Sequence, residues 1–476
     1  MNHKITFLLS FLLPSLLIAD TTKDVVDLVD PTVKLGQELG WISIIPFIAI
    51  LLSIAIFPLI NHHFWEKNFG KISAFWAFLF FIPFIKFAGF SSSMTALSHA
   101  MLEEYIPFIV LLFALFTISG GIVLRGNFVG TPGLNLLFLI IGTILASWMG
   151  TTGAAMLLIR PLIRANKWRK NKVHIMVFFI FLVANIGGSL TPLGDPPLFI
   201  GFLKGVKFFW TTEYMFMPML FVSSILMILF YIIDNYYFKR EINDKPPSTP
   251  VNFSIEGKLN FILLFGVIIS VLLSGMYDLG HTNFLHLKYQ NILRDITLLI
   301  LGIISYKMTS RSLRDENGFT WFPIVEVAKL FAGIFITIIP VIAILKAGDE
   351  GILSGLLNMT TKADNITPNE NMYFWLTGFL SSFLDNAPTY FVFFNSAGGE
   401  NNVIILMDEM WKTLLAISSG AVFMGAMTYI GNAPNFMVRS IAEENKIKMP
   451  SFFGYMVWSC LILIPIFLLY SLLWFF

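Results

Sequence analysis

Apolar runs of about 20 residues recur along the whole chain, and each is long enough to cross the hydrocarbon core of a bilayer. Hydrophobic residues make up 56% of the 476 residues and charged residues only 13%, too few charges to cover a soluble domain of this size. We therefore expect an all-α polytopic membrane protein whose surface is largely solvated by lipid. Continuous spans are predicted at 41–60, 72–90, 106–124, 215–236, 259–276, 292–306, 323–345 and 452–475.

The first 19 residues have the pattern of a targeting segment. Lys4 precedes an apolar run over 5–18, and Ala19-Asp20 follows. This pattern predicts either a secretory signal peptide cleaved after Ala19 or an uncleaved N-terminal anchor. Both readings make residues 20–40, which carry five acids, a periplasmic segment.

Charge and cysteine content exclude two classes of function. A net charge of +2 implies no general attraction to nucleic acid. The single cysteine, Cys460, excludes a disulfide within the chain and a metal cluster built from several cysteines.

Four further regions are apolar but interrupted by Gly, Pro, Asn and Thr. Helices broken at membrane depth are tolerated only where the break is buried in protein or faces a water-filled cavity. We interpret 133–163 and 372–396 as re-entrant hairpins, and 173–210 and 411–444 as broken helices.

These interrupted regions match each other in order. Residues 146–153 (ASWMGTTG) correspond to 381–388 (SSFLDNAP), 235 positions later, and 191–197 (TPLGDPP) correspond to 428–434 (TYIGNAP), 237 positions later. The nearly equal offsets predict two transmembrane repeats, 41–236 and 259–476, joined by a cytoplasmic linker at 237–258. Each repeat would contain three helices, a hairpin, a broken helix and a closing helix.

Loop charge predicts that the repeats are inverted. Residues 164–172 carry five basic side chains and no acid, whereas the corresponding 397–410 carry three acids and no base. The positive-inside rule then places the first loop in the cytoplasm and the second outside. Equivalent loops on opposite faces are typical of inverted-topology transporters.

Asp195 and Asp385 are the candidate ion- and proton-coupling residues, because both lie at predicted breaks inside the membrane. A carboxylate there costs several kcal/mol to keep charged unless a cation or a proton neutralises it. Na⁺ and H⁺ competing for one carboxylate would give antiport. The alternative is structural, because Asp also caps half-helices.

Hydroxyl and amide side chains at the tips and breaks are the candidate cation or substrate ligands. A broken helix exposes carbonyls that suit a hard cation such as Na⁺ and N–H groups that suit an anion, so both substrate classes stay open. The expected Na⁺ site centres on Thr151, Asp195, Asp385 and Asn432, and no cofactor other than the transported ions is expected. The other candidate ligands are Thr152, Ser189, Thr191, Asn386, Thr428 and Asn435.

Two motifs carry a family resemblance. Residues 189–199 (SLTPLGDPPLF), followed by Phe208-Phe209-Trp210, and residues 381–389 (SSFLDNAPT) resemble NhaD-type sodium/proton antiporters and the related citrate transporters of the ion transporter superfamily. The resemblance implies a homodimer in a bacterial inner membrane, with a scaffold and a transport domain that moves as an elevator. Citrate and dicarboxylate members bind Na⁺ and carboxylates with Ser-Asn-Thr tips, from which Gly150-Thr151-Thr152 and Asp385-Asn386-Ala387 depart.

Three functions are weighed against these residues. The first is Na⁺ (or Li⁺)/H⁺ antiport, which Asp385 at a hairpin tip favours, and the second is Na⁺-coupled transport of citrate or a dicarboxylate. A remote third is an intramembrane aspartyl protease using Asp195 and Asp385, but Pro192 stands where its motif expects glycine. We therefore expect a transporter rather than an enzyme.

Overall fold

The computed structural model describes residues 31–241, 253–282, 287–362 and 367–476. Within these ranges eight helices are long and apolar enough to cross a membrane, so the chain is a mainly α-helical, multi-pass membrane protein. The predicted signal peptide or anchor at 1–19 lies outside the described residues, as do 20–30 and 242–252. The eight helical stretches are Trp41–Pro58, His63–Ala88, Phe90–Ser119, Pro132–Met149, Trp210–Arg240, Leu259–Met276, Phe322–Lys346 and Phe452–Trp474.

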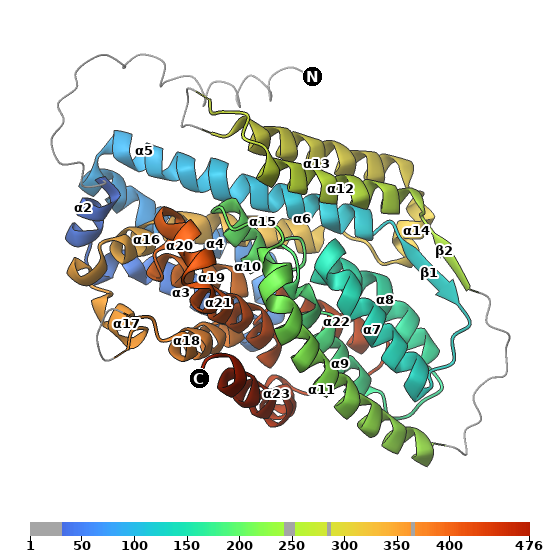
Figure 1. The fold of residues 1–476 in the computed structure, drawn as a ribbon. Helices are drawn as coiled ribbons and strands as arrows, with labels where there is room; N and C mark the ends of the chain where they lie inside the picture. Colours follow the sequence, from blue (N-terminus) through green and yellow to red (C-terminus); the bar gives the residue numbers. More distant parts are fainter. Residues whose placement is uncertain (1–30, 242–252, 283–286, 363–366) are drawn as a thin grey trace.

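One group of helices comes from the first part of each predicted repeat. Helix α4 packs against α3 and α15, and α6 packs against α12 and α13 (Figure 1). We name this group the scaffold helices. They are α2 (Pro31–Glu38), α3 (Trp41–Ile60), α4 (His62–Ala88), α5 (Phe90–His99), the π-helical turn η1 (Ala100–Tyr105), α6 (Ile106–Ser119), α12 (Leu259–Met276), α13 (Tyr289–Met308), α14 (Arg311–Glu316), α15 (Phe322–Thr337) and α16 (Ile339–Lys346).

The remaining helices comprise the expected hairpins, the interrupted helices, the helices that close them and short connecting helices. The pair α7 and α8 lies on the right of Figure 1, and α18 lies on the left. The elements are α7 (Pro132–Met149), α8 (Thr151–Ala165), α9 (Val173–Leu182), η2 (Ile186–Ser189), α10 (Pro196–Leu203), α11 (Trp210–Arg240), η3 (Gly348–Glu350), α17 (Ser354–Met359), α18 (Glu370–Phe383), α19 (Asn386–Ser396), η4 (Gly399–Asn402), α20 (Val403–Asp408), α21 (Trp411–Met424), η5 (Gly425–Met427), α22 (Ala433–Glu444) and α23 (Phe452–Trp474).

Both broken helices are interrupted by the residues that break helices in general. Each second segment, α10 and α22, has proline in its first turn, where the missing N–H is not needed. Glycines let each loop fold back on itself. A Cβ on Gly194 would lie 2.1 Å from the carbonyl oxygen of Gly188, and one on Gly431 would lie 2.6 Å from that of Gly425.

Some local features differ from the predicted spans. Helix α4 begins at residue 62 rather than 72. Its first turns carry charged residues, which hydropathy alone does not assign to a span, and they are nevertheless helical. Two four-residue strands, β1 (Val123–Gly126) and β2 (Phe253–Glu256), pair antiparallel and were not predicted. They lie on the connections from α6 to α7 and from α11 to α12, so this ribbon links the two groups of helices.

A buried ionic network fastens the base of the first hairpin to α11. Arg169, in the basic loop, pairs with Asp234 and with Glu241. Asp234 also accepts from Asn135 of α7 at 2.9 Å and lies 2.8 Å from His174 of α9. Buried charges are stable only when paired in this way. The loop, α7, α9 and α11 are therefore tied together at one end.

Candidate functional site

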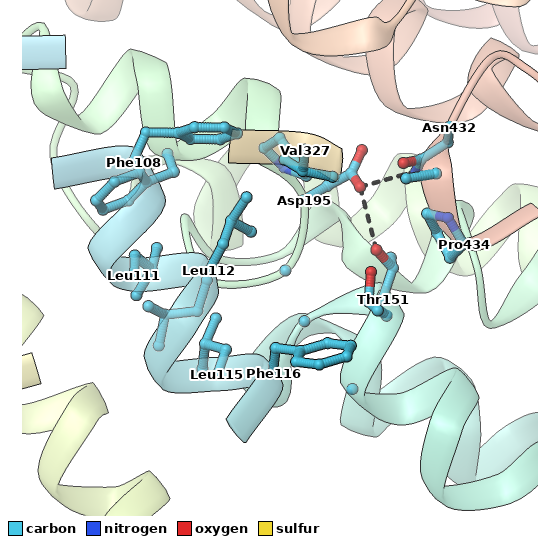
Figure 2. Close-up of a pocket in the computed structure, with 18 of the residues that line it drawn as sticks. Phe108, Leu111, Leu112, Leu115, Phe116, Thr151, Asp195, Val327, Asn432 and Pro434 are labelled. Atoms are coloured by element: carbon cyan, nitrogen blue, oxygen red, sulfur yellow. Dashed lines mark hydrogen bonds between the residues drawn. The ribbon is translucent and has the colours of Figure 1, made fainter. Parts of the chain in front are cut away.

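The hairpin tips meet the helix breaks around a cavity of about 110 Å³. We name residues 150–153 and 385–388 the first and second tips, and 183–195 and 425–432 the first and second breaks. Thr151, Asp195, Asp385 and Asn432, one from each tip and each break, all line this cavity. Figure 2 shows Asp195 between Thr151 and Asn432, facing apolar side chains of α6. That opposite wall includes Phe108, Leu111, Leu112, Leu115, Phe116, Val327 and Phe331.

Asp195 is the most strongly held of these side chains. It begins α10 and is only 1% exposed. Its carboxylate accepts hydrogen bonds from Thr151 Oγ1 at 3.3 Å, Asn386 Nδ2 at 2.6 Å and Asn432 Nδ2 at 2.9 Å. Donors from three other elements suit a carboxylate that carries charge. Among the described residues that line the cavity there is no Lys, Arg or His, so no fixed cation balances that charge.

Asp385 caps a half-helix, which is the structural alternative, and it also lines the cavity. It is the N-cap of α19, where its Oδ1 accepts from the backbone N–H of Ala387 at 3.1 Å. An N-cap of this kind satisfies one of the free N–H groups of the helix. The same residue lines both the small cavity and a larger one beside it. Capping and cavity lining therefore coincide in one carboxylate.

Asn386 leaves an acceptor unused. The side chain is fully buried and its Nδ2 donates to Asp195, but its Oδ1 has no hydrogen-bond partner. A buried polar atom without a partner costs about 1–3 kcal/mol. Asn386 itself does not line the small cavity, so among the cavity groups it acts through its hydrogen bond to Asp195.

The other predicted ligands divide into two groups. Thr152 lines the cavity. Ser189, Thr191, Thr428 and Asn435 do not line it, and their side chains bond instead to the backbone of the hairpin helices and the breaks. Ser189 Oγ donates to Ile186 at 2.8 Å, Thr191 to Ser147, Thr428 to Ser382, and Asn435 Nδ2 to Gly425 at 2.8 Å and Thr428 at 2.9 Å.

Two features of the site were not predicted. Ser147 holds the first break to α7, because its Oγ donates to the carbonyl of Gly187 at 2.5 Å and accepts from Leu190 N at 3.0 Å. The matched segment 146–153 contains Ser147 and could have suggested it. The apolar wall from α6 and α15 gave no signal, because α6 is apolar on every side and the sequence does not show which face of α15 meets the cavity.

A larger cavity of about 660 Å³ shares Asp385 and Asn432 with the first. Its lining includes Arg160, Glu326 and Glu444. Glu326 accepts from the indole N–H of Trp65 at 3.0 Å, whereas the buried Nη1 of Arg160 has no hydrogen-bond partner. The larger cavity therefore extends from Asp385, at the small cavity, to Arg160 and Glu444.

Comparison with known proteins gives one family. A family model described as "Putative citrate transport" matches residues 36–475, which is nearly the whole chain. No curated protein matches the chain. Within the described residues no three or more His, Cys, Asp or Glu side chains group closely enough to hold a metal ion. Any ion in the small cavity would thus be held by a mixture of carboxylate, amide and hydroxyl oxygens.

Proposed function

The chain belongs to this family of citrate-type transport proteins, and on that premise we propose that it is a secondary active transporter coupled to Na⁺ and H⁺. One observation carries the coupling: Asp195 and Asp385 line a single cavity whose described lining contains no cationic side chain. Two carboxylates in such an apolar enclosure repel each other unless a cation or a proton neutralises them. The ion is therefore part of the stable state of the site.

We propose Na⁺ (or Li⁺)/H⁺ antiport as the reaction. Na⁺ binds against Asp195 in the small cavity, where Thr151, Asp385 and Asn432 supply the other side-chain oxygens. These hard oxygen donors suit a small hard cation. A proton can occupy the same carboxylates, so Na⁺ and H⁺ exclude each other. That exclusion is what exchange of one ion for the other requires.

Alternating access is proposed to follow an elevator movement in a homodimer of the bacterial inner membrane. Inverted repeats are supported by the positions of α7 and α8 on one side of Figure 1 and α18 on the other, and by the basic loop that follows the first hairpin. The tips and breaks would move together along the scaffold helices. The larger cavity, lined by Arg160 and Glu444, would be the route to the cytoplasm.

Everted membrane vesicles with a pH-sensitive dye test this function. Vesicles from a host without its own sodium/proton antiporters should lose their proton gradient when Na⁺ or Li⁺ is added. Asp195→Asn and Asp385→Asn should abolish the response, whereas Asp315→Asn, which changes an exposed acid, should retain it. A wild-type protein that leaves the gradient unchanged would overturn the antiport proposal.

Na⁺-coupled citrate or dicarboxylate transport is the second candidate. The description of the family and the unpartnered Nη1 of Arg160 in the larger cavity favour it. A guanidinium is suited to bind a carboxylate. Under this function uptake of labelled citrate or succinate would require Na⁺, survive Asp385→Asn and fail in Arg160→Gln. Absence of Na⁺-dependent uptake in the wild type would exclude it.

A further inference from the structure

Asn185 lies in the first break, immediately before η2, and is fully buried. It does not line the small cavity. Its side-chain nitrogen and oxygen instead contact the end of the second break and the start of α22. Its Nδ2 donates to Asn435 Oδ1 at 2.7 Å and to the carbonyl of Ile180 at 2.8 Å. Its Oδ1 accepts from Asn432 Nδ2 at 3.2 Å. A Cβ on Gly425 would lie 3.1 Å from this Oδ1, so glycine leaves room for the amide.

The direction of each amide follows from the backbone carbonyls around it, because a carbonyl oxygen can only accept a hydrogen bond. The NH₂ group of Asn435 must face the carbonyls of Gly425 and Thr428. Its Oδ1 therefore faces Asn185 and needs a donor there.

The orientation of Asn185 in turn fixes that of Asn432, which lines the cavity. The NH₂ group of Asn185 serves Asn435 and Ile180, so its oxygen is presented to Asn432. Asn432 must then turn its NH₂ group toward this oxygen and the carbonyl of Ala184, and the two hydrogens are shared with Asp195 Oδ1, which lies 2.9 Å away.

We propose that Asn185 is a positioning residue that holds Asn432 as a hydrogen-bond donor to Asp195. It transmits the backbone geometry of the second break to the carboxylate on the first. Without it only the carbonyl of Ala184 and Asp195 itself hold the NH₂ group of Asn432, so its donation to Asp195 is less firmly fixed and the charged carboxylate that binds the cation is less stabilised. The role rests on the proposed function, because it assumes that Asp195 binds Na⁺.

A double-mutant cycle on purified protein tests the role, with apparent affinity for ²²Na⁺ as the readout. Asn185→Ala should weaken the affinity about tenfold, and in an Asn432→Ala background the same change should have less than about a twofold effect, because no amide is left to orient. Asn395→Ala is the matched control. Asn395 is also a buried amide, but it bonds within its own helix to Phe391.

The outcomes separate the role from a merely structural one. The role would be overturned if Asn185→Ala weakened Na⁺ affinity by the same factor in the wild type and in Asn432→Ala. It would also be overturned if the affinity of Asn185→Ala were no weaker than that of the Asn395→Ala control. If Asn185→Ala does not fold, Asn185→Ser replaces it in the same cycle, with folding checked by thermal melting in detergent. A wild-type protein that binds no Na⁺ would overturn the proposed function itself, whereas a binding wild type with independent effects overturns only the role of Asn185.

Discussion

The two tip-and-break units share their backbone contacts and differ in their polar side chains. In the first unit Thr191 donates to the carbonyl of Ser147 and accepts from Leu193 N at 3.2 Å. In the second, Thr428 donates to the carbonyl of Ser382 and accepts from Ile430 N, also at 3.2 Å. The threonines thus hold each break against its own hairpin in the same way.

The acids are arranged differently. At the start of the second half-helix the first unit has Asp195 and the second has Asn432. At the tip the first unit has Gly150, with φ of +80°, and the second has Asp385 as a helix cap. Each unit therefore supplies one carboxylate, from non-equivalent positions. Had both breaks carried Asp, two carboxylates would face each other where Asn432 now donates to Asp195. The threonine contacts shared by both units hold the breaks in place, whereas the non-equivalent acids supply the charges of the proposed ion site.

Asp195→Asn should have the largest effect. It makes the first break resemble the second, which already tolerates Asn at this position, so folding should persist. The cavity loses its best-held charge, and we expect Na⁺-dependent proton movement in vesicles to fall at least about 100-fold, as for loss of an essential buried charge. If the variant kept its Na⁺-dependent proton movement and its melting temperature, Asp195 would not be a coupling residue.

Asn432→Asp should be the next most damaging change. The new carboxylate would face Asp195, the carbonyl of Ala184 and Asn185 Oδ1, none of which donates. An unpaired buried charge costs about 3–5 kcal/mol. We expect a large fall in melting temperature and loss of transport. The exchanged pair Asp195→Asn with Asn432→Asp should not recover; recovery would mean that the two breaks are interchangeable.

Gly150→Ala should have a smaller effect, confined to stability. A Cβ at this position would meet only Leu193 O at 3.4 Å and Leu115 Cδ1 at 3.7 Å, so space is available. The positive φ is the obstacle, and we expect about 1–3 kcal/mol of destabilisation. Thermal melting checks it, with Gly133→Ala, which has open space and no positive φ, as the control. A stabilised Gly150→Ala would contradict the difference drawn between the tips.

Thr191→Val and Thr428→Val should have the smallest and most similar effects. Each removes one buried hydroxyl that bridges a break to a hairpin, worth about 1 kcal/mol. Matching decreases in melting temperature are expected, with little change in ion affinity because neither hydroxyl lines the cavity. A much larger loss of ion binding in one variant would assign that threonine to the site instead.

A feature can be predicted from sequence where a residue type imposes a local geometry. Pro196 and Pro434 begin half-helices, so the interruptions could be located without knowing what packs on them. Asp195 and Asp385 could be singled out because charge is rare inside a membrane. Tertiary partners could not be predicted: Asn185 bonds to Asn435, and Phe108 lines the cavity, because of packing between distant segments. The β1–β2 ribbon also forms between strands too short to give an alternating pattern.

The central claim is that carboxylates from both units form one cation site. Equilibrium binding of ²²Na⁺ to the purified protein tests it directly, with Asp195→Asn and Asp385→Asn each compared with the wild type. The account predicts that protons displace Na⁺ from the wild type and that each substitution weakens binding strongly. Na⁺ binding of unchanged affinity in both variants would contradict it.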